Sequence, residues 1–159
     1  MFTKRNIQCL STSVDEAWDF LSDPKNLAKI TPPDLRFEIV SGAEKKMYAG
    51  QIIQYHVRSF FGIKTEWIAE ITYVKEKAYF VDEQRYGPYK MWHHKHFIRA
   101  IPNGVEMENI VDYSVPLGIF GKWIHSFIIK PKLDKIFEFR RQKLIEIFGE
   151  YDPEVSKTA

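Results

Sequence analysis

The segment FVDEQRYGPYKMWHHKHFI, Phe80–Ile98, reads as two strands joined by a turn at Gly87-Pro88. Side chains two residues apart in a strand point to the same face of a sheet. Five polar or aromatic side chains of the segment follow this spacing, namely Asp82, Gln84, Trp92, His94 and His96. The segment therefore predicts one patterned wall, either of a binding site or of a half-polar sheet surface.

Further strand-like runs lie on both sides of this segment, separated by short turns. The hairpin signal is strongest at Asn103-Gly104, because both residues tolerate the positive φ that a tight type I′ turn requires. Short connections make neighbouring strands antiparallel. The pattern predicts a meander of six strands: Phe37–Val40, Gln51–Phe61, Ile63–Lys75, Tyr79–Tyr86, Tyr89–Ile101 and Val105–Val115.

Before the meander, the pattern predicts one strand, Phe2–Leu10, and two short helices. Ser13 and Glu16 form a capping box, in which each side chain satisfies a free amide at the start of the first helix. Asp23-Pro24 starts the second, with aspartate as the cap and proline in the first turn.

After the meander, the period of the apolar residues becomes helical, and we expect Pro131 to kink or split the helix. A basic amphipathic helix can lie on a membrane surface, but an apolar stripe beside a large sheet favours packing against that sheet. The sequence thus predicts an α+β fold ending in a long helix. Its apolar stripe comprises Phe120, Ile124, Phe127, Leu133, Ile136, Phe137, Arg140, Leu144, Ile147 and Phe148.

Length and composition indicate one domain, 1–150, followed by a flexible tail, 151–159. The formal net charge of +2 gives no strong field for nucleic acid. A lone Cys9 and a polar N-terminus without an export signal predict a cytoplasmic protein. No apolar run is long enough to span a membrane, so we expect no stable membrane insertion.

Charged residues on the predicted strands should face water, which turns the alternate positions toward the helix. The inward set combines aromatic residues with polar ones that need partners. This mixture predicts a mostly apolar pocket with a few orienting groups. The predicted ligand-binding residues are Tyr55, Trp67, Asp82, Gln84, Trp92, His94, His96, Asn109 and Tyr113.

The order of elements and a set of short motifs resemble the SRPBCC superfamily, in particular its bacterial ligand-binding branch. That superfamily unites START lipid-transfer domains, birch-pollen-allergen-like proteins and polyketide cyclases or dehydrases. The motifs that carry the resemblance are Asp82-Glu83-Gln84, Gly87-Pro88-Tyr89, Trp92-His93-His94-Lys95-His96, Asn103-Gly104, Tyr113 and Pro116-Leu117-Gly118.

The resemblance implies a helix-grip fold, in which a curved antiparallel sheet wraps around the C-terminal helix and encloses a cavity. Where relatives often carry an acidic residue, this chain has Asn109, which weakens a role for a carboxylate there. A helix-grip fold hosts binding, transfer and catalysis, so the fold alone does not decide the function.

The expected partner is a small hydrophobic molecule, such as a lipid, fatty acid, isoprenoid or polyketide-like compound, which is bound, transported or sensed. One alternative is a cyclase or dehydratase in which Asp82 acts with His94 or His96 to move a proton. Another is an interaction or regulatory module with an incidental pocket. The pair His94 and His96 could face a metal, with Asp82 as the nearest candidate for a third ligand, but no Cys cluster or His-x-x-Glu pattern supports a metal site. We therefore assign no metal and no cofactor, and the pattern indicates no oligomeric state.

Overall fold

The computed structural model describes residues 1–58, 62–116, 123 and 125–154. Several sequence predictions fall outside this part of the chain. They are the end of the second meander strand at 59–61, the motif residues Leu117 and Gly118, the helix positions Phe120 and Ile124, and residues 155–159 of the tail.

The described strands form one curved antiparallel sheet in the order β1-β7-β6-β5-β4-β3-β2. The predicted meander is confirmed, and β1 closes it by pairing with the last strand, β7. The strands are β1 (Phe2–Leu10), β2 (Glu38–Ser41), β3 (Gln51–Arg58), β4 (Lys64–Lys75), β5 (Tyr79–Tyr86), β6 (Met91–Ile101) and β7 (Gly104–Ser114).

The helices between β1 and β2 begin as the sequence predicts. In α1 (Val14–Leu21), the backbone amide of Glu16 donates to the Ser13 hydroxyl, and the Ser13 amide donates to the Glu16 carboxylate, each at 3.1 Å. The second helix is the 3₁₀ segment η1 (Pro24–Ile30), where the Lys25 amide donates to the Asp23 carboxylate at 3.0 Å. A short 3₁₀ turn, η2 (Pro33–Leu35), follows. These turns bring the chain across the inner face of the sheet.

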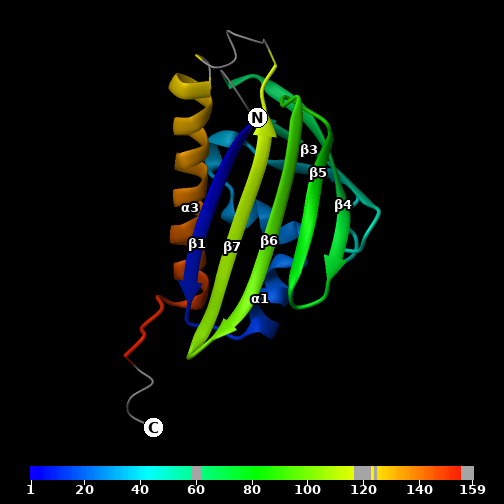
Figure 1. Cartoon of the computed structure of the whole chain (residues 1–159). Coiled ribbons are helices and arrows are strands. Elements are labelled where there is room, and N and C mark those ends of the chain that lie inside the picture. The colour runs from blue at the N-terminus through cyan, green and yellow to red at the C-terminus, as the bar shows by residue number, and fades with distance from the viewer. Residues whose placement is uncertain (59–61, 117–122, 124, 155–159) are drawn as a thin grey trace.

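The C-terminal helix changes geometry at the predicted proline. A π-helical segment, η4 (His125–Ile129), leads into α3 (Lys130–Phe148), with Pro131 in its first turn. Proline is tolerated there because the first amides of a helix have no intrahelical acceptor. Figure 1 shows α3 running beside β1 at one edge of the sheet.

The predicted apolar stripe of this helix is only partly buried. Leu133, Phe137 and Leu144 are buried, as expected. Phe127 and Ile147 are 72% and 42% exposed, so their assignment to the buried face was wrong. The reason is that α3 packs near the β1 edge, and a helix at an edge buries a narrower face than one centred on the sheet.

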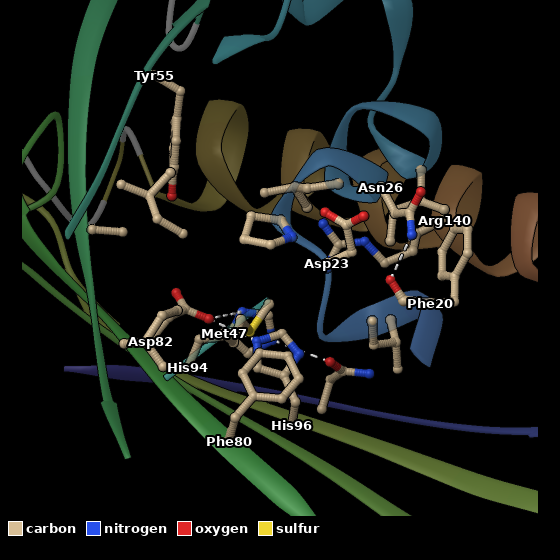
Figure 2. Close-up of a pocket in the computed structure, with 18 of the residues that line it drawn as sticks. Phe20, Asp23, Asn26, Met47, Tyr55, Phe80, Asp82, His94, His96 and Arg140 are labelled. Carbon is tan, nitrogen blue, oxygen red and sulfur yellow. Dashed lines mark hydrogen bonds and ion pairs between the residues drawn. The ribbon is translucent and has the colours of Figure 1, made fainter. Parts of the chain in front are cut away.

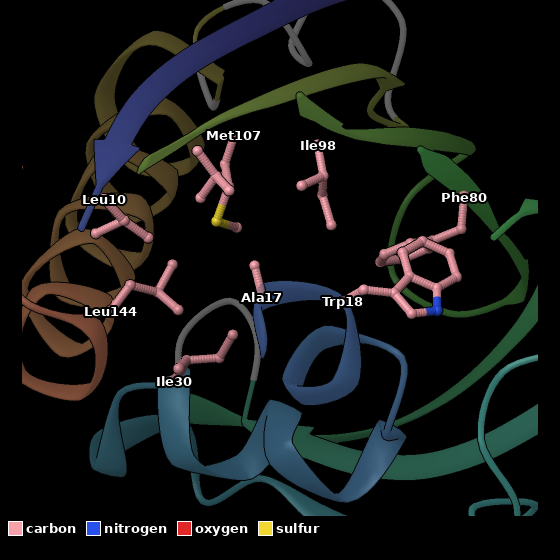
Figure 3. Close-up of a cluster of buried hydrophobic side chains, with 9 residues drawn as sticks. Leu10, Ala17, Trp18, Ile30, Phe80, Ile98, Met107 and Leu144 are labelled. Atoms are coloured by element: carbon pink, nitrogen blue, oxygen red, sulfur yellow. The ribbon is translucent and has the colours of Figure 1, made fainter. Parts of the chain in front are cut away.

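One core cluster joins α1, η1, α3 and the sheet (Figure 3). Leu10 of β1, Val105 of β7 and Leu144 of α3 are fully or almost fully buried in it. Burying one leucine side chain contributes about 1.5–3 kcal/mol. This cluster fixes α1 and α3 against one end of the sheet.

The start of the predicted tail is attached to the domain. The Tyr151 hydroxyl donates to the carbonyl oxygen of Pro102 at 2.9 Å, and Glu150 forms an isolated bridge with Leu10. In the described residues, no helix is both long and apolar enough to cross a membrane.

Candidate functional site

A pocket of about 150 Å³ lies against the inner face of the sheet (Figure 2). Most of its opposite wall is the segment between Phe20 and Met47, which includes η1, and α3 contributes only Arg140. We expected the cavity between the sheet and the C-terminal helix, so the position differs, because η1 crosses the sheet there. The lining residues are Phe20, Leu21, Asp23, Pro24, Asn26, Leu27, Ile30, Phe37, Ile39, Met47, Ile53, Tyr55, Ala69, Ile71, Phe80, Asp82, Trp92, His94, His96, Met107, Asn109 and Arg140.

The polar part of the sheet wall centres on Asp82. Asp82 of β5 is directly opposite His94 of β6 in the strand register, and His96 follows two residues later on the same face. Asp82 Oδ1 lies 2.7 Å from His96 Nε2 and 3.6 Å from His94 Nδ1. One carboxylate oxygen therefore faces both imidazoles. The two-residue period of β6 and its pairing with β5 together produce this grouping.

His94 is the most enclosed of these groups. Its Nε2 lies 3.2 Å from Oδ1 of Asn109, and because an amide oxygen only accepts, we assign the ring proton to Nε2. Burial lowers the pKa of His94 well below its usual 6.5, with further contributions from His96 and Arg140. His94 is therefore neutral near pH 7, with the lone pair of Nδ1 directed at the Asp82 side.

His96 is held between two rings. It stacks on Phe80 with ring centroids 4.1 Å apart and lies 3.6 Å from the ring of His94. Together with the hydrogen bond to Asp82, these contacts fix its orientation. A fixed imidazole paired with a carboxylate can orient a ligand or exchange a proton with it.

Arg140 lines the pocket but was not among the predicted ligand-binding residues, because its spacing placed it in the apolar stripe of the C-terminal helix. It reaches the pocket from α3 (Figure 2), and its Nε is buried without a hydrogen-bond partner among the described residues. Burial lowers the pKa of the guanidinium, whereas Asp82 and Tyr55 raise it. Arginine remains charged under these conditions. A cation inside an apolar helical stripe was the available signal in the sequence.

Six of the nine predicted ligand-binding residues line the pocket. These are Tyr55, Asp82, Trp92, His94, His96 and Asn109. Tyr55 is buried, which raises the pKa of its hydroxyl well above 10.0, so this group stays neutral. The wall opposite the sheet, including Asp23, Asn26 and Met47, was not predicted, because no strand alternation relates it to the others.

Trp67, Gln84 and Tyr113 lie outside the pocket lining. Gln84 bonds to the turn instead: its Nε2 donates to the carbonyl oxygen of Tyr89 at 2.7 Å, and its Oε1 accepts from the Tyr89 amide at 3.2 Å. Trp67 packs against Tyr55 and against Trp92, with ring centroids 6.1 and 5.3 Å apart. The sheet face predicted for these residues therefore did not by itself place them in the pocket, because each side chain makes a contact elsewhere.

The hydroxyl of Tyr113 lies 2.7 Å from Nε2 of His125, at the opposite end of the sheet from α1. The His125 ring also stacks on Phe2, with centroids 3.5 Å apart. Burial lowers the pKa of His125 and raises that of Tyr113. Both groups are therefore neutral near pH 7, and they connect η4 to β7.

Asp82, His94 and His96 could also hold a divalent cation. One donor atom from each lies within 4.8 Å of the others. Two imidazoles and one carboxylate leave coordination positions open toward the pocket, a donor set that zinc and iron accept. The Asp82–His96 hydrogen bond satisfies two of these groups without a metal.

The family model for polyketide cyclases/dehydrases and lipid transport matches residues 10–138 of the chain. The chain belongs to this family. The match runs from the last residue of β1 into the first half of α3, and it therefore includes every residue that lines the pocket except Arg140. The family match confirms the resemblance to the SRPBCC superfamily. The search of curated proteins found no match to the chain.

Solved structures show the same helix-grip fold as this family member. A protein from Chromobacterium violaceum gives a TM-score of 0.72 at 12% identity, covering 95% of this chain and 100% of its own. A START superfamily protein from Mycobacterium smegmatis gives 0.68 at 12% identity, with coverage of 91% and 98%. A major latex-like protein from Panax ginseng gives 0.67 at 11% identity, with coverage of 92% and 97%. The predicted fold class is confirmed.

Proposed function

We propose that the protein binds a small hydrophobic molecule in the pocket between the sheet and η1. The observation that carries this proposal is a pocket of about 150 Å³ whose wall is mainly aliphatic and aromatic, with a few polar groups in one region. Ligand sites commonly combine an apolar wall with a small number of orienting polar groups. Membership of a family described by lipid transport supports the same class of ligand.

The polar groups argue against a mere packing defect. Asp82, His94 and Arg140 all border the pocket, and burying such groups beside an empty space costs free energy that an apolar core would avoid. A bound molecule with its own polar atoms would recover part of that cost. The pocket is therefore better suited to an amphipathic ligand than to a pure hydrocarbon.

A pocket-filling substitution tests the proposal. Ala69 lies on β4 and borders the pocket, so Ala69→Leu should occupy part of its volume. Ala100 is exposed on β6, so Ala100→Leu is the matched control. The purified protein is extracted with organic solvent, the extract is analysed by mass spectrometry, and binding of benzyl alcohol, a probe small enough for the pocket, is titrated by calorimetry. We expect Ala69→Leu to lose the co-purified molecule and weaken probe binding. Equal binding by both variants and wild type would place the ligand elsewhere.

A second candidate function is proton transfer next to a carbonyl group, as a cyclase or dehydratase requires. It is favoured by the Asp82–His96 contact of 2.7 Å at the pocket wall, where His96 would remove the proton and Asp82 would stabilise the imidazolium. The test is deuterium exchange, followed by NMR, at the carbon between the carbonyls of an enolisable β-keto thioester. Exchange that wild type accelerates and Asp82→Asn abolishes would support catalysis. Binding of the thioester without accelerated exchange would exclude it.

A further inference from the structure

Arg140 introduces a permanent positive charge into a mostly apolar pocket. Its side chain reaches the lining from α3, and the guanidinium carbon lies 5.7 Å from the centroid of the Phe137 ring. Its Nε is buried and has no hydrogen-bond partner in the described residues. An uncompensated buried charge is costly, and natural proteins usually pair it. The position therefore calls for a counter-charge.

The carboxylates that share the pocket are committed to other partners. Asp82 accepts the hydrogen bond of His96 at 2.7 Å. Asp23 caps η1 by accepting from the Lys25 amide at 3.0 Å. Among the described residues, the ion pairs of the chain do not include Arg140, although Asp82 is near enough to raise its pKa. The side chains present thus leave donor capacity on Arg140 that a ligand can use.

We propose that Arg140 anchors the carboxylate of a small amphipathic acid whose apolar body fills the pocket. This inference rests on the proposed binding function and specifies the ligand class. A guanidinium presents paired N–H donors that match a carboxylate in geometry and charge. The aromatic lining around Tyr55, Phe80 and Trp92 is suited to the rest of the molecule.

The volume of the pocket limits the size of this acid. A cavity of about 150 Å³ accommodates a molecule the size of benzene, so an apolar body of about six carbons is expected. Benzoate and hexanoate represent the aromatic and aliphatic forms of this class. A phosphate group carries more negative charge than a carboxylate, and Asp82 on the same pocket disfavours it. The proposal is therefore a monocarboxylic acid.

Isothermal titration of wild type with matched acids and alcohols tests the proposal. The probes are benzoate against benzyl alcohol, and hexanoate against hexanol, with hexyl phosphate as a third arm. A charge-assisted hydrogen bond in a buried site should make each acid bind about tenfold to a hundredfold more tightly than its alcohol. Arg140→Met should remove this preference while binding of the alcohols is kept, and Arg140→Lys should keep part of it.

Arg141→Met is the matched control, because Arg141 is the next residue of α3 and pairs with Glu138 at the surface at 2.8 Å. It should keep the wild-type preference for acids. Circular dichroism checks that each variant is folded, and the acid-to-alcohol ratio of wild type needs no variant at all. Alcohols that bind as tightly as acids, or hexyl phosphate that binds more tightly than hexanoate, would overturn the carboxylate anchor but leave the binding function intact. If none of these compounds binds, the binding function itself fails.

Discussion

His94 Nε2 and Asn109 Oδ1 lie 3.2 Å apart on adjacent strands, and this contact decides which nitrogen of His94 carries the proton. Asn109 occupies the position at which the family resemblance predicts an acidic residue. An amide cannot stabilise an imidazolium as a carboxylate can. Burial, with further contributions from His96 and Arg140, keeps the pKa of His94 well below 6.5, and the hydrogen bond to Asn109 only partly opposes this shift.

The depressed pKa of His94 predicts a loss of stability in acid. In the unfolded chain His94 is protonated below about pH 6.5, whereas in the folded chain it stays neutral. The contribution of His94 to the free energy of unfolding is therefore fully present above that pH. It should decrease below that pH by about 1.4 kcal/mol per pH unit for one such proton, down to the pKa of the folded protein. Urea unfolding between about pH 5 and 8 measures the slope.

His94→Gln should reduce this slope by one proton, because glutamine does not titrate. His125 also has a lowered pKa, so the variant keeps a residual slope, and the difference between the two proteins is the informative quantity. His93 pairs with Glu83 at 2.7 Å on the other face of β6, and His93→Gln should leave the lowered-pKa contribution of His94 in place. A slope unchanged in His94→Gln would mean that His94 is not held neutral.

We expect substitution of Arg140 to increase stability while it weakens the binding of acids. Arg140 is a partly exposed residue whose buried Nε has no partner among the described residues. Replacing it with methionine removes an unsatisfied donor, so Arg140→Met should raise the free energy of unfolding by about 1–3 kcal/mol without ligand. Arg141→Met removes only a surface ion pair and should change it by less than about 1 kcal/mol. Denaturant unfolding of the two variants provides the comparison. A large destabilisation by Arg140→Met would show that the guanidinium stabilises the fold.

Two positions of the predicted apolar stripe differ in burial and should differ in mutational cost. Leu144 is 2% exposed in the core cluster, whereas Ile147 is 42% exposed. Leu144→Ala should therefore destabilise by about 2–5 kcal/mol, because it leaves a cavity beside Leu10 and Met107. Ile147→Ala should cost less than about 1 kcal/mol. Thermal unfolding followed by circular dichroism would show the difference, and equal costs would contradict the observed packing of α3.

Local patterns predicted those features that depend on local geometry. The capping box of Ser13 and Glu16 and the turn at Asn103 follow from short-range hydrogen bonding and backbone conformation. The grouping of Asp82, His94 and His96 follows from strand alternation and from the pairing of two consecutive strands. None of these features depends on segments that are distant in the sequence.

Features that depend on how distant segments pack could not be predicted in this way. Two strands, β6 and β7, and the segment η4 lie between Asp82 and Arg140 in the described chain, and periodicity placed Arg140 only on a helix face. The position of α3 near β1 decides that Arg140 borders the pocket while Ile147 faces solvent. Likewise, the wall formed by η1 depends on the path of the chain after α1, which apolar spacing does not specify.

Gln84 shows the same limit within a strand and gives the last prediction. Its alternation with Asp82 is correct, but the pairing of β5 with β6 ends at Glu83 and His93, so Gln84 lies beside the turn. There its amide makes two bonds to the backbone of Tyr89, at 2.7 and 3.2 Å. A Cβ at Gly87 would lie 2.5 Å from Gln84 Oε1, so a side chain at this position would push the Gln84 amide away from the turn.

Gln84→Ala should therefore destabilise the protein by about 1–3 kcal/mol, since both backbone bonds are lost, and leave ligand affinity within about twofold of wild type. Gln142→Ala is the control, because Gln142 donates to Glu138 on the exposed face of α3. Denaturant unfolding and the acid titrations described for Arg140 measure the two effects. Weaker binding with unchanged stability would return Gln84 to the ligand-binding set, because only a direct contact with the ligand would separate the effects in that direction.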